Sequence, residues 1–200
     1  MKSITVIDYG VGNIRNVIKA LDFVGYRVTF TNHHHIIEQS DRLLLPGVGA
    51  FQPAMKRLES LQLTSTIKHH AEQGKPLLGI CLGMQLLCKS STEFGYYEGL
   101  GLLDSDISEF TDVPKNPHMG WNQLHITNPD DTLFKNVTSN ESVYFVHSFK
   151  ASLSDQTAAK TDYFGEFSSI LKHDNIVGMQ FHPEKSQKTG LQLLKNFGEI

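Results

Sequence analysis

Apolar and polar residues follow two different spacings along the first half of the chain. Apolar runs with the length of a buried strand lie at residues 3–10, 26–32, 41–47 and 76–81. Apolar residues at the three- and four-residue spacing of a helix lie at residues 13–25, 50–63, 64–74 and 83–91. Such alternation of strands and helices predicts a mostly parallel sheet with helices on both faces.

The second half of the chain has mainly strand patterns. They lie at residues 121–127, 142–151, 156–161, 167–173 and 175–183, and a last helical pattern covers residues 188–200. We find no internal repeat and no linker rich in proline, glycine or serine between the halves. The sequence therefore predicts an α/β fold with a β-rich second half, organised as a single domain over residues 1–200.

Composition narrows the class of protein. A hydrophobic content of 40% and a charged content of 20% are ordinary for a soluble globular chain. The net charge of −3 gives no electrostatic case for nucleic acid or an anionic membrane as partner. No apolar run approaches the roughly 20 residues that cross a bilayer, and residues 1–9 fit a strand better than a signal peptide. Two cysteines do not make a secreted disulfide framework, so we expect a cytoplasmic protein.

One cysteine stands where a predicted strand turns into a predicted helix. Cys81 has Gly79 and Gly83 on either side, which is the form of a nucleophile elbow. A thiol there lies at a helix N-terminus, and the N–H of Leu82 is free to donate to an oxyanion. The alternative is a buried cysteine that only packs beside a helix-start glycine. Cys88 lacks flanking glycines, and we expect it to pack on the helix.

A cysteine nucleophile needs a histidine to share its proton and a third group to orient that histidine. His182 is the strongest candidate because it ends an apolar strand pattern and precedes Pro183 and Glu184. Proline favours an extended conformation at His182, and side chains two apart in an extended segment face the same side. We therefore expect the Glu184 carboxylate to reach the imidazole. A His-x-Glu pair without a third spaced ligand does not predict a metal site.

The other histidines have simpler interpretations. We expect residues 33–35 to be solvated in a polar connection, and residues 69–70 to lie late in a helix, where the dipole favours them. We expect His118, His125 and His147 to lie in or beside strands.

Two glycine-containing loops follow predicted strands. In the segment 46–49, Gly47 and Gly49 permit backbone angles closed to other residues, so N–H groups can turn towards a neighbouring site; a tight strand–helix turn is the alternative. The segment 9–16 has Gly10 and Gly12 but Arg15 where a dinucleotide-binding loop has its third glycine. We therefore predict no cofactor.

Taken together, these segments resemble the class I (triad) glutamine amidotransferases, and among them the glutaminase subunits of imidazole glycerol phosphate synthases. The resemblance covers nearly the whole chain and rests on DYGVGNIRNV, PGVGAF, GICLGMQLL, GLGLL, PHMGWNQL, YFVHSF and GMQFHPEKS. It implies a flavodoxin-like fold, with Cys81 as nucleophile, His182 as base and Glu184 as its orienting group. It further implies glutamine-binding positions at Gly49, Leu82, Gln85, His147, Ser148 and Phe149.

The same resemblance implies a partner. Ammonia from glutamine would pass to a separate HisF-like (β/α)₈ cyclase subunit in a heterodimer, which forms imidazole glycerol phosphate in histidine biosynthesis. By resemblance, the partner-facing residues are Asn13, Met119, Trp121 and Lys185. Core packing is the alternative for Trp121.

Three other functions fit part of the pattern. The segments 88–99 and 144–156 differ from the histidine-pathway form, and paralogous subunits supply ammonia to amino-sugar pathways. A stand-alone cysteine hydrolase would lack the partner-facing motif PHMGWN, and a non-catalytic regulatory subunit would not need Cys81, His182 and Glu184 intact.

Overall fold

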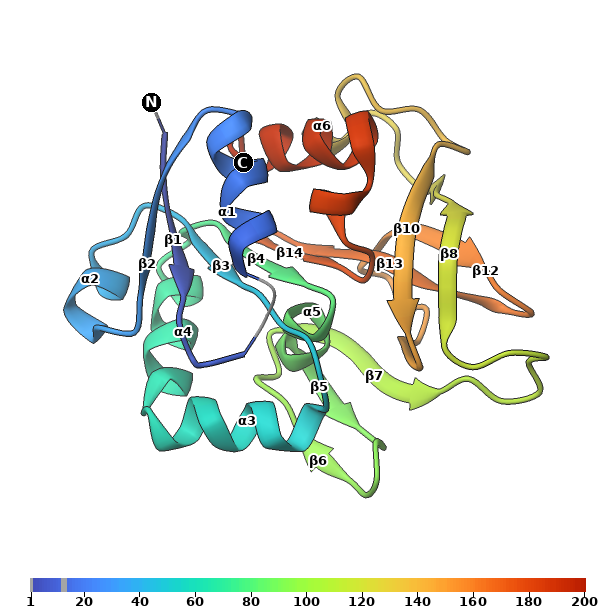
Figure 1. Ribbon diagram of the computed structural model, residues 1–200, viewed down its shortest axis with the longest axis horizontal. Coiled ribbons are helices and arrows are strands. Elements are labelled where there is room, and N and C mark those ends of the chain that lie inside the picture. Colours follow the sequence, from blue (N-terminus) through green and yellow to red (C-terminus); the bar gives the residue numbers. More distant parts are fainter. Residues whose placement is uncertain (1, 12–13) are drawn as a thin grey trace.

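The computed structural model describes residues 2–11 and 14–200 (Figure 1). The first half alternates strands and helices, as predicted: β1 (Lys2–Ile7), α1 (Ile14–Phe23), β2 (Tyr26–Thr31), α2 (His34–Glu38), β3 (Leu43–Leu45), α3 (Phe51–Ser60), α4 (Leu63–Glu72), β4 (Leu77–Ile80) and α5 (Leu82–Leu87).

Strands dominate the second half. Their bounds are β5 (Cys88–Ser91), β6 (Tyr97–Glu98), β7 (Leu103–Glu109), β8 (His118–Gln123), β9 (His125–Ile126), β10 (Ser142–His147), β11 (Phe149–Ala151), β12 (Thr157–Asp162), β13 (Glu166–His173) and β14 (Ile176–Met179). The helical elements are two short 3₁₀ turns, η1 (Thr132–Phe134) and η2 (Pro183–Lys185), and the closing helix α6 (Gln187–Phe197).

A large mixed sheet crosses both halves of the chain. Strands β2, β1, β3, β4 and β14 lie side by side in that order and run parallel. Beyond β14 the sheet continues through β13, β11, β7, β5 and β6, mostly with antiparallel pairing. Strands β8 and β10 form a separate antiparallel pair. The carboxyl ends of the parallel strands therefore meet at one edge, where open α/β folds bind their ligands.

Both faces of the parallel strands are apolar, so the sheet has a core on each side. In β3, Leu44 belongs to one core, whereas Leu43 and Leu45 belong to the other. Helices α1 and α6 cover the first core, and α3, α4 and α5 cover the second (Figure 1). This two-sided burial explains why the strands appear in the sequence as continuous apolar runs.

The predicted helix at 83–91 is wrong in its second half. Helix α5 ends at Leu87, and Cys88 begins strand β5 rather than lying on a helix. The backbone N–H groups of Leu100 and Leu102 donate hydrogen bonds to the carbonyls of Leu86 and Leu87. The N–H of Gly101 donates to the carbonyl of Cys88. Because long-range partners occupy these carbonyls, the helix cannot continue. Cys88 is fully buried, which agrees with the packing interpretation.

The histidine segment 33–35 also differs from a plain polar connection, because it opens the short helix α2. His33 and His35 are exposed, as expected. His34 is half-buried and contacts the hydroxyl of Thr66 at 2.8 Å and the carbonyl of Leu61 at 3.0 Å. His69 and His70 lie in the last turn of α4, as expected. His70 is buried there, and burial lowers its pKa to about 4.

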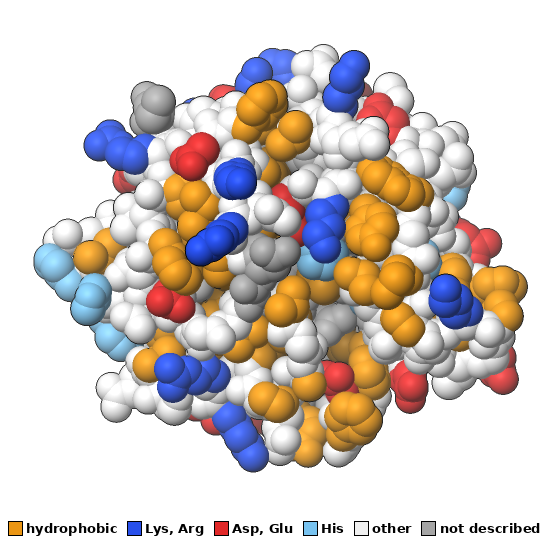
Figure 2. Space-filling view, viewed as in Figure 1, with side chains coloured by type: hydrophobic (Ala, Val, Ile, Leu, Met, Phe, Trp, Pro, Cys, Tyr) orange, Lys and Arg blue, Asp and Glu red, His pale blue; other side chains and the backbone are white. Residues whose placement is uncertain are grey.

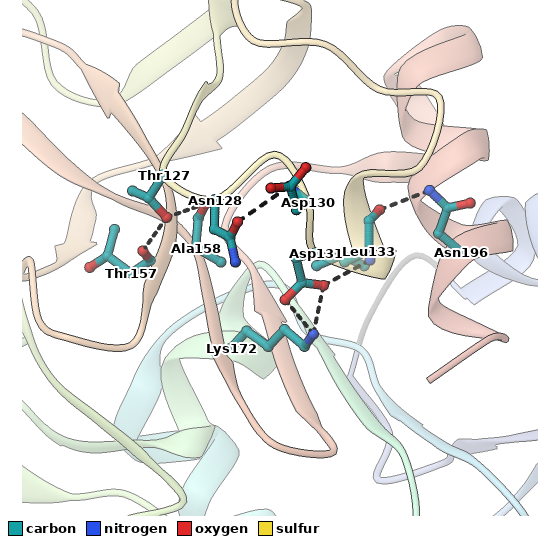
Figure 3. A network of polar contacts seen from close by, with 9 residues as sticks. All are labelled: Thr127, Asn128, Asp130, Asp131, Leu133, Thr157, Ala158, Lys172 and Asn196. Atoms are coloured by element: carbon teal, nitrogen blue, oxygen red, sulfur yellow. Dashed lines mark hydrogen bonds and ion pairs between the residues drawn. The ribbon is translucent and has the colours of Figure 1, made fainter.

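A polar network fixes the 3₁₀ turn η1 against the sheet and α6 (Figure 3). The Asp131 carboxylate accepts the N–H of Leu133 at 2.9 Å and pairs with Lys172 of β13 at 2.6 Å. The side-chain amide of Asn196 in α6 donates to the carbonyls of Leu133 and Lys135, at 2.8 and 2.7 Å. The network therefore holds η1 between strand β13 and helix α6.

We predict that Asn196→Ala lowers the free energy of unfolding by about 2 kcal/mol, because it leaves buried carbonyls without a donor. Urea unfolding of the purified chain measures this. Asp130→Ala, at an exposed position of the same loop, is the control and should stay within about 0.5 kcal/mol of wild type. Equal stability of the two variants would contradict the role of Asn196.

Candidate active site

Cys81 occupies a sharp turn between β4 and α5. Its backbone has φ 53° and ψ −113°, which is rare and strained for a residue with a side chain. The turn is held because the Cys81 N–H donates to the carbonyl of Met179 in the neighbouring strand β14, at 2.8 Å. The residue is only 7% exposed. This is the geometry of a nucleophile elbow at the carboxyl edge of the sheet.

Close packing explains the glycines on both sides of Cys81. A Cβ atom at Gly83 would lie 1.9 Å from the carbonyl oxygen of Leu45, at the end of β3. A Cβ at Gly79 would lie 2.7 Å from the backbone nitrogen of Met84. Neither position has room for a side chain, so the glycines let the helix start directly against the strands.

His182 and Glu184 meet, but not through an extended segment as the sequence suggested. His182 itself is extended, and Pro183–Lys185 then forms the 3₁₀ turn η2, closed by a bond from the Lys185 N–H to the His182 carbonyl at 3.0 Å. The turn brings Oε1 of Glu184 to 2.9 Å from Nδ1 of His182. Both side chains are almost completely buried.

The environment of His182 favours its charged form. Burial alone lowers the pKa, but the interactions with the Cys81 sulfur and the Glu184 carboxylate outweigh it and raise the pKa of His182 to about 9. The other ring nitrogen, Nε2, is buried and has no protein hydrogen bond of good geometry among the described residues. Because Glu184 holds Nδ1, Nε2 is the nitrogen at which the charged ring gains or loses its second proton, beside the Cys81 sulfur.

Cys81 and His182 line a cavity of about 410 Å³. All six residues for which the resemblance implied glutamine binding also line it: Gly49, Leu82, Gln85, His147, Ser148 and Phe149. The amide of Gln85 is anchored, because its Nε2 donates to the carbonyl of Phe149 at 3.1 Å and to Oε1 of Gln180 at 3.0 Å. The structure thus places these positions around one space beside the thiol.

Sequence reasoning missed Glu93, which also lines the cavity. It is 9% exposed, and its carboxylate accepts the N–H of Phe51 at the start of α3, at 2.6 Å. A buried carboxylate at the cavity wall is complementary to an ammonium group. No motif marks Glu93 in the sequence, because it reaches the cavity only where the segment after β5 meets the start of α3.

His147 lines the cavity and belongs to a pair of buried histidines, with His118 behind it. His147 Nδ1 faces the carbonyl of Phe149 at 2.8 Å, so this nitrogen carries the proton. His147 Nε2 then accepts from Nδ1 of His118 at 3.0 Å, and Nε2 of His118 faces the amide of Asn122 at 3.3 Å. Each contact then joins one donor to one acceptor: Asn122 donates to His118, His118 to His147, and His147 to the Phe149 carbonyl. This arrangement requires both rings to be neutral.

The residues implied to face a partner lie beside the cavity, as far as the structure describes them. Met119 and Trp121 on β8 are 52% and 50% exposed, so Trp121 is not a core residue. They pair with Val146 and Tyr144 of β10, and Val146 lines the cavity. Lys185 is exposed, with its Nζ 5.7 Å from the centre of the Tyr144 ring. Asn13 lies outside the described residues.

The space-filling view shows the same surface from outside. Hydrophobic side chains gather where Figure 1 draws β10 and β8, beside a histidine near the centre of the face (Figure 2). Within residues 2–11 and 14–200, no cluster of three or more His, Cys, Asp or Glu side chains is arranged to hold a metal ion. In the same part of the chain, no helix has the length and apolar character needed to cross a membrane.

The fold and this site define a class of protein. The family model for class-I glutamine amidotransferases matches residues 5–199, and the chain belongs to this family. Among curated proteins, it is 49% identical over 195 residues to "Imidazole glycerol phosphate synthase subunit HisH" of Aquifex aeolicus, covering 96% of this chain and 94% of that one. It is 45% identical to the HisH subunit of Syntrophotalea carbinolica, covering 98% and 100%.

A solved structure agrees on the fold. The structure of PurLQS from Thermotoga maritima aligns with a TM-score of 0.70 at 17% identity, covering 98% of this chain and 97% of that chain. At this identity the likeness shows the shared architecture alone.

We predict that acid destabilises the chain through its buried histidines. Burial lowers the pKa of His118 to about 4 and that of His147 to about 3. The unfolded chain binds protons at these groups near pH 6.5. Stability conferred by the neutral rings is therefore complete above about pH 6.5 and falls as the pH decreases towards about 4.

His118→Phe tests this, because phenylalanine keeps a ring stacked between Phe145 and Tyr163 but cannot titrate. The loss of unfolding free energy between about pH 7 and about pH 5 should be smaller in the variant by about 2 kcal/mol. Urea unfolding at both pH values measures it. An equal loss in wild type and variant would show that His118 is not held neutral.

Proposed function

We propose that this chain is the glutaminase subunit of an imidazole glycerol phosphate synthase. It hydrolyses glutamine to glutamate and ammonia through Cys81, His182 and Glu184. The observation that carries the proposal is a strained cysteine elbow that shares one cavity with His182, whose Nδ1 lies 2.9 Å from Glu184. The names of relatives that are 43–49% identical over nearly the whole chain support the same assignment.

In the proposed first step, the Cys81 sulfur attacks the side-chain amide carbon of glutamine. The thiol proton passes to Nε2 of His182, and the protonated imidazole returns it to the departing nitrogen as ammonia leaves. Glu184 orients the ring and stabilises its positive charge, in the manner of the third member of a catalytic triad. The product of this step is a γ-glutamyl thioester on Cys81.

In the second step, His182 takes a proton from a water molecule that attacks the thioester carbon. The C–S bond breaks, glutamate forms and the thiol regains its proton. Both tetrahedral intermediates carry an oxyanion, which needs N–H donors. The N–H of Leu82 has no partner within α5 because it belongs to the first turn. We assign the second donor to a peptide of the loop 47–49.

Glutamine recognition follows from the chemistry of the cavity wall. The anchored amide of Gln85 and the backbone of residues 147–149 offer donors and acceptors for the amino-acid end of the substrate. The buried carboxylate of Glu93 is suited to the α-ammonium group. A charge-assisted contact of this kind, in a water-poor cavity, would position the side-chain amide over the sulfur.

We further propose that the partner is a (β/α)₈ cyclase subunit, bound as a heterodimer over the face that contains the cavity. Met119 and Trp121 are large and half-exposed, as anchors of an interface would be, and Met119 pairs with Val146 of the cavity wall. A partner seated there would receive ammonia without its release to solvent.

The sheet that crosses both halves supports a single domain over residues 1–200. Two buried cysteines without a disulfide are consistent with a cytoplasmic location.

We predict that Cys81→Ser abolishes glutamate release in the assembled enzyme while the chain stays folded. Serine has a far higher pKa than cysteine, so its hydroxyl is a much weaker nucleophile beside His182. Loss of an essential triad member costs on the order of 10⁴-fold or more. Cys88→Ser is the matched control, because Cys88 is also a buried free thiol, and it should retain most of the activity. Turnover near wild type in Cys81→Ser would remove this residue from the mechanism.

We predict that Trp121→Ala weakens binding of the cyclase subunit by roughly 30-fold, as expected for an interface anchor worth about 2 kcal/mol. Titration calorimetry measures the affinity, and partner-stimulated glutamate release should fall with it. Phe23→Ala is the control, because Phe23 is also an exposed aromatic residue but ends α1 at the opposite edge of the sheet. Equal affinities of the two variants would contradict the interface. If the chain supplied ammonia to an amino-sugar enzyme and not to the cyclase, its pathway would be amino-sugar synthesis instead of histidine biosynthesis.

A further inference from the structure

The loop between β3 and α3 forms one side of the cavity and is held at both ends. At its start, the hydroxyl of Tyr9 donates to the carbonyl of Pro46 at 2.6 Å. At its end, the N–H of Phe51 donates to the carboxylate of Glu93, also at 2.6 Å. Both contacts are buried. The backbone is therefore restrained at Pro46 and at Phe51, on either side of the residues 47–50.

Gly47, the first residue inside these two contacts, rests directly on the elbow. A Cβ there would lie 2.8 Å from the backbone nitrogen of Gly83, 2.8 Å from Cβ of Leu82 and 2.9 Å from the hydroxyl oxygen of Tyr9. Gly49 differs, because it has φ +104° and nothing within 4 Å of a Cβ at that position. Backbone rotation in this loop is therefore confined to its middle, at Val48 and Gly49.

Among residues 2–11 and 14–200, the Tyr9 hydroxyl has its hydrogen bond to this loop. Tyr9 is fully buried two residues beyond the end of β1, and burial followed by the nearby Cys81 raises its pKa, so the hydroxyl keeps its proton. Its backbone carbonyl accepts from Nε of Arg57 in α3 at 3.1 Å, which fixes the residue from the other side. The phenol thus connects the segment that follows β1 to the loop that faces the sulfur.

We propose that Tyr9 is a positioning residue for hydrolysis. It fixes the Pro46–Gly47 end of the loop, so that the peptides at Val48 and Gly49 present an N–H to the oxyanion. This inference rests on the proposed glutaminase function. Tyr9 does not contact the substrate; it acts through the loop. Its loss should affect the reaction step, in which the oxyanion forms, more than the binding of glutamine.

Tyr9→Phe in the assembled enzyme with its cyclase subunit tests the proposal, because it removes the hydroxyl and keeps the ring. One oxyanion donor is worth roughly 10²–10³ in rate, and a loosened donor should cost roughly tenfold in kcat, with KM for glutamine changed less than about twofold. Glutamate γ-semialdehyde, whose aldehyde adds the Cys81 thiol to give a tetrahedral hemithioacetal, should bind more weakly by the same factor.

Tyr26→Phe is the matched control. The Tyr26 hydroxyl is also buried and donates to a backbone carbonyl, that of Leu194 at 3.0 Å, but it lies at the start of β2, away from the cavity. The two variants should lose similar stability in thermal unfolding, while only Tyr9→Phe loses kcat. If Tyr9→Phe does not fold, Gly47→Ala disturbs the same contact from the loop side and should also lower kcat.

Wild-type kcat in folded Tyr9→Phe or Gly47→Ala would overturn the proposal, as would equal losses in the Tyr9 and Tyr26 variants. A fall confined to KM would also overturn it, because it would make Tyr9 a residue for substrate binding. These outcomes are separate from failure of the proposed function itself. In that case the wild-type complex would release no glutamate from glutamine.

Discussion

The site depends on one close contact, the approach of the first turn of α5 to the end of β3. No atom larger than hydrogen fits between Gly83 and the carbonyl of Leu45, so the helix can start directly at the carboxyl edge of the sheet. The elbow at Cys81 follows from this approach. The remaining parts come from the neighbouring strands: the loop 46–50 follows β3, and His182 follows β14, which pairs with β4. The thiol, the base and the proposed oxyanion loop therefore lie close together, because they follow adjacent strands of the sheet.

Burial strengthens the electrostatic interactions between the charged groups of the site. His182 and Glu184 are shielded from water, so their interaction is much less screened than a surface pair. The pKa of His182 rises, whereas burial lowers the pKa of its neighbour His147. Two histidines a short distance apart thus have opposite charge preferences. Of these two histidines, His182 is the one with a carboxylate and a thiol beside it, which suits it to carry the proton that moves in the proposed reaction.

The parts of the fold and site that could be predicted depend on local chemistry. The elbow and the meeting of His182 with Glu184 follow from glycines and a proline within two positions of the functional side chains. The start of β5 at Cys88 could not be predicted, because distant N–H groups take the carbonyls that would continue α5. Glu93 and Tyr9 were missed for the same reason. Each hydrogen-bonds to one end of the loop between β3 and α3, from 37 and 42 residues away in the sequence. No sequence motif indicates these contacts.

The central claim is that Cys81 forms a covalent bond to the substrate. The most direct measurement is rapid acid quenching of the assembled enzyme during turnover of glutamine, followed by mass spectrometry of the peptide that contains Cys81. We predict a mass increase of one γ-glutamyl group on Cys81 and none on Cys88. Turnover of glutamine with no adduct at Cys81, and an adduct on another residue, would contradict the claim.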